Sequence, residues 1–287
     1  MIRQHPLPFF FGLTFLLSWL IWVPMALDHF SLLPFTKLDE NFVLIVRLFG
    51  TFGPAIAASL VALILGGKSA VKKLWSQIGL WRVNWTWYVA AAVVFPVLVC
   101  VAAWLYNLLP GIEPFSIQQV SPATLLVIMI IMTISVTGEE IGWRGFALPE
   151  LQKRWTALKA SLLLGTIHTL WHLPFWITLG ELERYGWSYW LLSWAWILAL
   201  TIYMTWILNN TGNSLLLVLI FHFSLNVVNN AFLPITTVVP TYTLLIGIAW
   251  LLVLGILARY GSRRLVRSNA GTPGVPPTLI RSSGFSD

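Results

Sequence analysis

The sequence has 287 residues, of which 58% are apolar and 9% are charged, whereas an ordinary soluble domain is roughly 45–50% apolar and about 25% charged. With a mean hydropathy of +0.81, 17 Trp and 17 Phe, the chain carries more apolar surface than one water-excluded core can bury, so we expect lipid to be its main solvent. The net charge of +7 comes from basic residues scattered between long apolar runs, which indicates membrane topology rather than nucleic-acid binding.

Eight apolar runs approach the length of about 20 residues that a membrane span requires. In chain order they are residues 7–27, 42–65, 86–109, 122–138, 158–179, 187–208, 213–232 and 241–259. The first run is longer than the apolar part of a typical signal peptide and lacks a clear cleavage site near Ala26, so we expect a retained helix. The sequence therefore predicts an all-α polytopic membrane protein of about eight transmembrane helices, with residues 1–267 as a single transmembrane domain.

The basic residues indicate the orientation of these spans. With eight spans, 14 of the 17 Lys and Arg residues lie at the termini and in the loops after even-numbered spans, and only Lys37, Arg47 and Arg184 lie on the other side. The positive-inside rule then predicts a multi-pass integral membrane protein, in the plasma membrane if the source is prokaryotic, with both termini in the cytoplasm. Residues 268–287 are rich in Gly, Pro and Ser, which predicts a disordered cytoplasmic tail.

The fourth apolar run ends in two adjacent carboxylates. A charge at the centre of a span costs roughly 2.5–3.5 kcal/mol, so we expect these groups near the cytoplasmic end, in a cavity, or both. Glu140 and Arg144 are four residues apart with the acid first, the favourable order for a helical ion pair. Glu139 is turned about 100° away and has no basic residue three or four positions later, which leaves it free for chemistry. Taken alone, the cluster is also compatible with an ordinary ion pair at a solvated helix end.

The fifth run carries two imidazoles on one helical face. His168 and His172 are four residues apart, the spacing of zinc ligands on a helix. The zinc-protease pattern has Glu directly after the first His, but Thr169 stands there, so a catalytic acid would have to come from another helix. Hydrogen bonds between helices are the alternative role for these histidines.

The seventh run carries a third polar pair at the same spacing, His222 and Asn226. Hydrogen bonding between helices is again the alternative, and Asn229 and Asn230 are interpreted as polar residues near the membrane edge. Together the three runs supply a carboxylate, imidazoles, a guanidinium and an amide. These groups can activate water and stabilise an oxyanion, so the combination predicts a hydrolytic site.

At these residues the sequence resembles the CAAX protease and bacteriocin-processing (CPBP) membrane proteins, also called the abortive-infection domain family, which includes the Ras-converting CAAX endopeptidase. The family's motifs are Glu-Glu-x-x-x-Arg, an aromatic residue separated by three residues from a His, and His-x-x-x-Asn/Asp. They match, in order on the fourth, fifth and seventh runs, Glu139, Glu140, Arg144, His172, His222 and Asn226. The resemblance covers about residues 120–235. His168 occupies the aromatic position of the second motif. Three roles are open for it: an added ligand, a residue that tunes the site, or a neutral replacement of the aromatic residue.

The resemblance implies an intramembrane endopeptidase that hydrolyses a membrane-associated peptide or protein. It implies that Glu139 and His172 act on the water, and that His222 and Asn226 stabilise the oxyanion. If a divalent metal such as Zn²⁺ takes part, the candidate ligands are Glu139, His172 and His222, with His168 as an addition. The spacing leaves metal-dependent and metal-free glutamate mechanisms open. The expected partners are membrane lipid and the substrate, and nothing in the sequence indicates a prenyl-specific pocket.

Other mechanisms fit the sequence less well. An aspartyl intramembrane protease needs two Asp at membrane depth, but all three Asp residues lie in predicted loops or the tail. Ser214 is two turns from His222 on one helix, too far for a Ser–His dyad, and Cys100 lies among Val and Ala, where a thiolate would be costly. No repeat indicates a transporter. The remaining alternative is a non-catalytic membrane scaffold or a bacteriocin-immunity-type binding protein.

Overall fold

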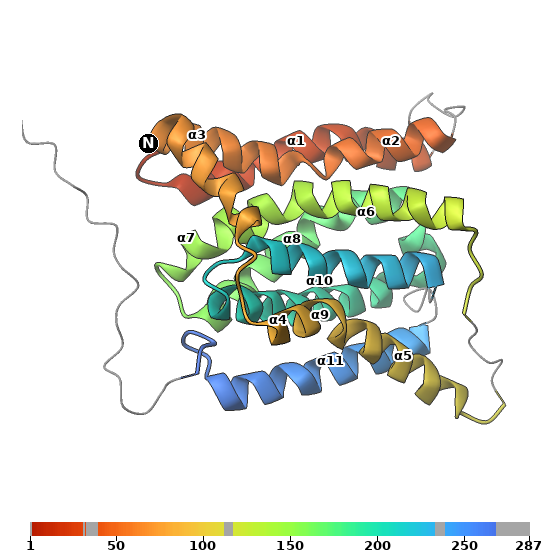
Figure 1. Ribbon diagram of the computed structural model, residues 1–287. Helices are drawn as coiled ribbons and strands as arrows, with labels where there is room; N and C mark the ends of the chain where they lie inside the picture. The colour runs from red at the N-terminus through yellow and green to blue at the C-terminus, as the bar shows by residue number, and fades with distance from the viewer. Residues whose placement is uncertain (1, 31, 33–39, 112–116, 233–238, 268–287) are drawn as a thin grey trace, which may run out of the picture.

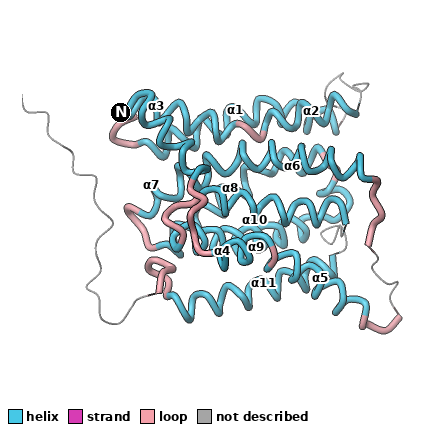
Figure 2. The backbone as a smooth tube through the Cα atoms, in the orientation of Figure 1, coloured by secondary structure: helices cyan, strands magenta, loops and turns pink. Residues whose placement is uncertain are grey.

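The computed structural model describes residues 2–30, 32, 40–111, 117–232 and 239–267, and these contain helices and no strand. The predicted tail, residues 268–287, lies outside the described residues. The longer helices are α1 (Pro6–His29), α2 (Glu40–Gly50), α3 (Gly53–Ser76), α4 (Trp85–Ala92), α5 (Val94–Asn107), α6 (Pro122–Gly142), α8 (Ala157–Thr178), α9 (Glu181–Asn210), α10 (Leu215–Val227) and α11 (Val239–Tyr260). The short elements are η1 (Gln77–Gly79), η2 (Trp143–Ala147), α7 (Leu148–Gln152) and η3 (Val228–Phe232). The predicted all-α fold is confirmed (Figure 2).

Seven helical segments within the described residues are long and apolar enough to cross a membrane. They are Pro6–Asp28, Ile45–Gly79, Trp85–Asn107, Pro122–Gln152, Glu183–Asn210, Leu215–Phe232 and Val239–Tyr260. They correspond to seven of the eight predicted runs. The remaining run is the fifth, residues 158–179, which corresponds to α8. Its 22 residues are also enough to span a bilayer, but its Lys, Ser, Thr and His residues lower its hydropathy.

The helices form a bundle, and α8 lies behind α6 and α10 in the view of Figure 1. It packs against α1 on one side and α9 on the other, while α6 packs against α3 and α10. The amides of Ala157 and Leu158, at the start of α8, donate to the carbonyls of Arg263 and Ser262 after α11, at 2.9 and 3.1 Å. The N-terminus and the described end of the chain lie at the same end of the bundle (Figure 1).

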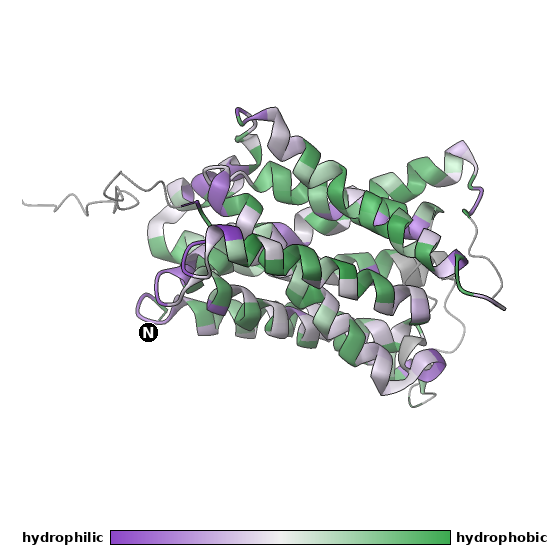
Figure 3. Cartoon of the chain, turned by 90° about the horizontal axis from the view of Figure 1, so that it is seen from below, coloured by the Kyte–Doolittle hydropathy of each residue, from purple (hydrophilic) through white to green (hydrophobic). Residues whose placement is uncertain are grey.

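The outer surface of the bundle is apolar along its length. Large side chains such as Leu20, Trp104 and Leu251 are 60–69% exposed there, and the hydrophilic residues gather mainly at the two ends (Figure 3). Cys100, in α5, is also exposed on this surface, outside the cavity described below. Such a surface is stable in lipid and not in water, and the chain is an integral membrane protein.

Two glycines bring α6 into close contact with the start of α3. A Cβ atom on Gly138 would lie 2.9 Å from the carbonyl oxygen of Thr51, and one on Gly142 would lie 2.5 Å from the carbonyl oxygen of Pro54. Small residues four positions apart allow this kind of backbone approach between membrane helices. The contact holds the end of α6, which carries both carboxylates, against the N-terminus of α3.

We expect Gly142→Ala to lower the free energy of unfolding by about 1–3 kcal/mol, because the new methyl group meets backbone that cannot rotate away. Gly247→Ala in α11 is the matched control, since a Cβ there meets nothing within 4 Å, and removing an interior helical glycine stabilises by roughly 0.5–1 kcal/mol. Unfolding of the two purified variants in the same detergent measures the difference. Equal stability of the two variants would contradict the close contact.

Candidate active site

The first motif lies where α6 passes into a π-helical turn. Glu139 and Glu140 are in the last turn of α6, and Arg144 is in η2. All three side chains are buried, with exposed fractions of 4%, 0% and 1%. π-Helical turns within helices occur frequently at functional sites, and here the turn lies directly at the charged residues.

Glu140 is held in an internal hydrogen-bond network. Its Oε1 accepts from Arg144 Nη1 at 2.9 Å and from His222 Nδ1 at 2.7 Å, and Arg144 Nη2 donates to Thr201 Oγ1 at 2.9 Å. The predicted pairing of Glu140 with Arg144 is confirmed. Glu140 does not line the cavity described below.

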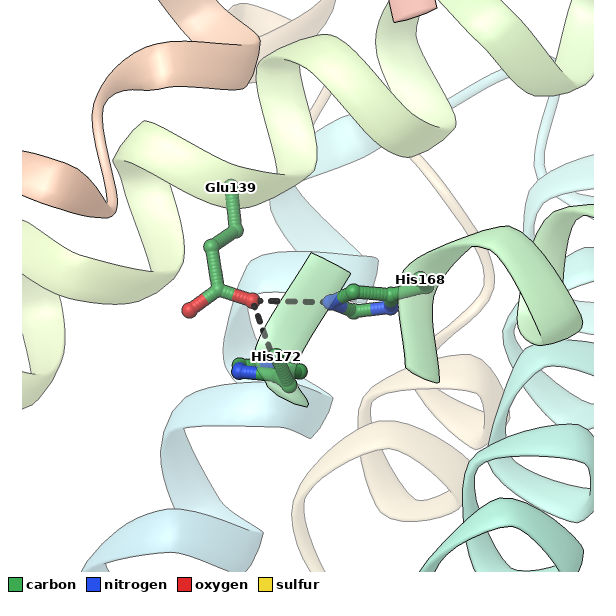
Figure 4. A group of neighbouring side chains, drawn as sticks. All are labelled: Glu139, His168 and His172. Carbon is green, nitrogen blue, oxygen red and sulfur yellow. Dashed lines mark hydrogen bonds and ion pairs between the residues drawn. The ribbon is translucent and has the colours of Figure 1, made fainter. Parts of the chain in front are cut away.

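The carboxylate of Glu139 points toward the two histidines of α8 (Figure 4). Its Oε2 lies 3.2 Å from His168 Nε2 and 3.8 Å from His172 Nε2. Ser135 Oγ, one helical turn earlier, donates to Oε1 at 3.3 Å. The His172 distance is longer than a direct hydrogen bond, so a polar atom of a ligand or water can contact both groups.

His168 connects the two carboxylate environments. Besides its contact with Glu139, its Nδ1 lies 3.4 Å from Arg144 Nη1. The ring is 4% exposed and packs near Trp143 and His172, with ring centroids 5.0 and 4.8 Å away. The imidazole that departs from the family pattern is therefore at the centre of the site.

These residues line a cavity of about 390 Å³ inside the bundle. Glu139, Arg144, His168, His172, His222 and Asn226 form its polar part. Asn229 and Asn230, interpreted from the sequence as residues near the membrane edge, line it as well. The remaining wall is mainly apolar and aromatic and includes Trp176, Trp196, Leu200, Met204, Tyr242 and Leu245. All six predicted catalytic residues thus lie in or directly behind one cavity wall.

Two groups of described residues could hold a metal ion, because their ligand atoms lie within 4.8 Å of one another. One is Glu139, His168 and His172, and the other is Glu139, Glu140 and His222. The predicted ligands are therefore divided between two groups. His168, predicted as an additional ligand, lies with Glu139 and His172, while His222 lies on the side of Glu140.

Two residues that make polar contacts in the site, Ser135 and Thr201, were not predicted from the sequence. Ser135 is four residues before Glu139, so helical spacing could have indicated its contact with Glu139. Thr201 is 57 residues from Arg144 and belongs to none of the three motifs, so the sequence contains no signal for its role.

Comparison with known proteins connects this site to a family. Residues 121–228 match the family described as type II CAAX prenyl endopeptidase Rce1-like. The chain is 36% identical over 113 residues to the CAAX prenyl protease 2 of Methanococcus maripaludis, an alignment that covers 38% of this chain and 41% of that relative. The matched family segment begins next to α6 and contains all three motifs. The resemblance to the CAAX protease family is confirmed.

Proposed function

We propose that this protein is an intramembrane endopeptidase, because its motif-bearing core is similar to the type II CAAX prenyl endopeptidases. The observation that carries the proposal is the position of Glu139. Its buried carboxylate lines a cavity inside the bundle and faces His172 across 3.8 Å. A carboxylate in such a cavity has a large desolvation cost, and a catalytic role accounts for that cost.

In the proposed reaction Glu139 is the general base. A water between Glu139 Oε2 and His172 Nε2 can lie within hydrogen-bond reach of both atoms, since they are 3.8 Å apart. Glu139 takes one proton as the water oxygen attacks the carbonyl carbon of the scissile peptide bond. The carbonyl oxygen becomes an oxyanion, and the proton held by Glu139 then passes to the leaving amine as the C–N bond breaks.

We assign the oxyanion to the other side of the cavity, where His222 and Asn226 lie. His222 Nδ1 is engaged by Glu140 at 2.7 Å, so Nε2 is the ring nitrogen left for the substrate. Donation from Nε2 requires a proton on both ring nitrogens, with the Glu140 carboxylate as the counter-charge. The Asn226 side-chain amide supplies a second donor, and donors arranged before the reaction are the main source of oxyanion stabilisation.

The proposed mechanism uses no metal, because the hydrogen-bonding environment of neither candidate group suits a metal site. A His that binds a metal through Nε2 donates its Nδ1–H to an acceptor, but Nδ1 of His168 faces the guanidinium of Arg144, which can only donate. In the second group, His222 Nδ1 and Glu140 Oε1 are 2.7 Å apart, whereas two ligands of a tetrahedral zinc ion are about 3.4 Å apart given the usual bond lengths. Both arrangements suit hydrogen bonds.

We further propose that the substrate carries a lipid group close to the scissile bond. The wall formed by Trp196, Leu200, Met204 and Leu245 is apolar and continues from the polar groups, so it can accommodate an alkyl or isoprenoid chain. The similar protein of Methanococcus maripaludis is named a CAAX prenyl protease, which supports the same substrate class.

We also propose that both termini are cytoplasmic. The two described ends of the chain lie at the same end of the bundle (Figure 1), which supports this orientation.

Cleavage of matched peptides tests the proposed function. The purified protein in lipid vesicles is given one membrane-tethered peptide series ending in a farnesylated Cys segment and the same series without the farnesyl group. We expect endoproteolysis of the farnesylated series with at least tenfold higher kcat/KM, and unchanged rates after treatment with a metal chelator. Rates that fall with the chelator and recover on adding Zn²⁺ would overturn the metal-free mechanism. A folded protein that cleaves neither series would support the scaffold or immunity role.

A further inference from the structure

His168 lies between Arg144 and Glu139, and the proposed reaction gives it no role. We propose that His168 is a positioning residue, fixed by Arg144 as its neutral Nε2–H tautomer, that holds the Glu139 carboxylate in place for the attack of water. The positioning role rests on the proposed function, because it assumes that Glu139 acts as the base. The tautomer itself is a property of the resting protein.

The tautomer follows from the donors around the ring. A guanidinium has only N–H donors and stays protonated in proteins, so at the 3.4 Å contact between Arg144 Nη1 and His168 Nδ1 the ring nitrogen has to accept. A neutral imidazole then carries its proton on Nε2. That nitrogen lies 3.2 Å from Glu139 Oε2, and a carboxylate oxygen is an acceptor, so the two contacts require the same tautomer.

Arg144 is a fixed anchor for this chain of hydrogen bonds. It is 1% exposed and also donates to Glu140 Oε1 and Thr201 Oγ1, each at 2.9 Å. The ring of His168 is confined between neighbouring aromatic side chains, with Trp143 and Trp171 centroids 5.0 and 5.5 Å away. The fixed guanidinium of Arg144 thus holds the His168 ring in one orientation, and the ring in turn contacts Glu139.

The consequence for Glu139 is that both carboxylate oxygens have a defined donor. Ser135 donates to Oε1 and His168 donates to Oε2, which fixes the plane of the carboxylate. Each oxygen has two lone pairs, so Oε2 keeps one for the water next to His172. Holding a base at the geometry needed for proton transfer raises the rate without changing how tightly the substrate binds.

Two substitutions distinguish the Nε2 contact from the rest of the side chain. In His168→Gln the amide nitrogen can occupy the place of Nε2 and donate to Glu139. In His168→Asn the shorter amide can still accept from Arg144 but does not reach Glu139. We expect His168→Asn to lower kcat by about 10–100-fold, the usual effect of losing such a supporting contact, with KM within twofold of the original protein. His168→Gln should recover most of kcat, and both variants should unfold at the same temperature.

Equal kcat in His168→Gln, His168→Asn and the original protein would overturn the positioning role and leave the proposed endopeptidase standing. Equal loss in both variants, or a loss that follows stability, would assign His168 a purely structural role and overturn the inference.

A spectroscopic test does not depend on cleavage. The protein contains five histidines, so the ring nitrogens of a sample labelled with ¹⁵N-histidine can be assigned to His168 by comparison with His168→Gln. We expect a protonated Nε2 and an unprotonated Nδ1 at neutral pH in the substrate-free protein. A proton on Nδ1, or on both nitrogens, would overturn the inference even if no substrate is ever found.

Discussion

Glu139→Gln is expected to lower kcat/KM for peptide cleavage by about 10²–10⁴-fold, the usual contribution of a general base, while the protein remains folded. Glutamine has nearly the shape of glutamate and its amide oxygen can still accept a hydrogen bond from His168 or Ser135. It cannot take a proton from water. Cleavage of a farnesylated peptide by the purified variant, together with its unfolding temperature, measures both properties.

Glu150→Gln is the matched control for this substitution. Glu150 makes an ion pair with Lys153, whose side chain is 66% exposed, and exposed ion pairs contribute little to stability. The same change of charge outside the cavity should leave kcat/KM within twofold. If folded Glu139→Gln cleaved at the rate of the original protein, Glu139 would not be the base.

Arg144→Met is expected to lower the free energy of unfolding by about 3–5 kcal/mol, the usual cost of leaving one member of a buried ion pair without its partner. Glu140 is 0% exposed, so its charge would remain in the interior, with the contact from His222 Nδ1 at 2.7 Å but without the guanidinium. Thr201 would also lose the guanidinium that donates to it. Unfolding of purified protein in one detergent, followed by intrinsic Trp fluorescence, measures this loss.

The double variant Glu140→Gln with Arg144→Met separates the unpaired charge from lost packing. It leaves no unpaired carboxylate, so we expect it to recover at least half of the stability that Arg144→Met loses. Lys153→Met, which breaks the exposed pair with Glu150, should change stability by less than about 1 kcal/mol. A double variant as unstable as Arg144→Met would assign the loss to packing around the guanidinium.

The polar pairs show how far local spacing predicts the site. Glu140 and Arg144 are four residues apart, and they form the predicted ion pair at 2.9 Å. The same spacing places Glu139 on a different face, and the structure has it lining the cavity while Glu140 does not. These relations follow from the pitch of one helix, so they can be read without knowing which helices are neighbours.

The prediction of spans shows the limit of hydropathy. Seven predicted runs have counterparts among the membrane-length apolar helices of the described residues, because lipid selects for apolar side chains on every exposed face. The helix α8 lies outside this set because its Lys, Ser, Thr and His residues lower its hydropathy. Hydropathy alone therefore misses a membrane-length helix that places His168 and His172 on the wall of the cavity.

The sequence by itself determined the all-α membrane class, the three polar pairs and the different helical faces of the two adjacent carboxylates, because each depends on composition or on spacing within one helix. Only the tertiary structure decided that His168 lies between Arg144 and Glu139, and that His222 meets Glu140. These contacts join residues 24, 29 and 82 positions apart. They depend on which helices pack together and at what depth, and the backbone approach at Gly142 and the π-helical turn at Arg144 set that register.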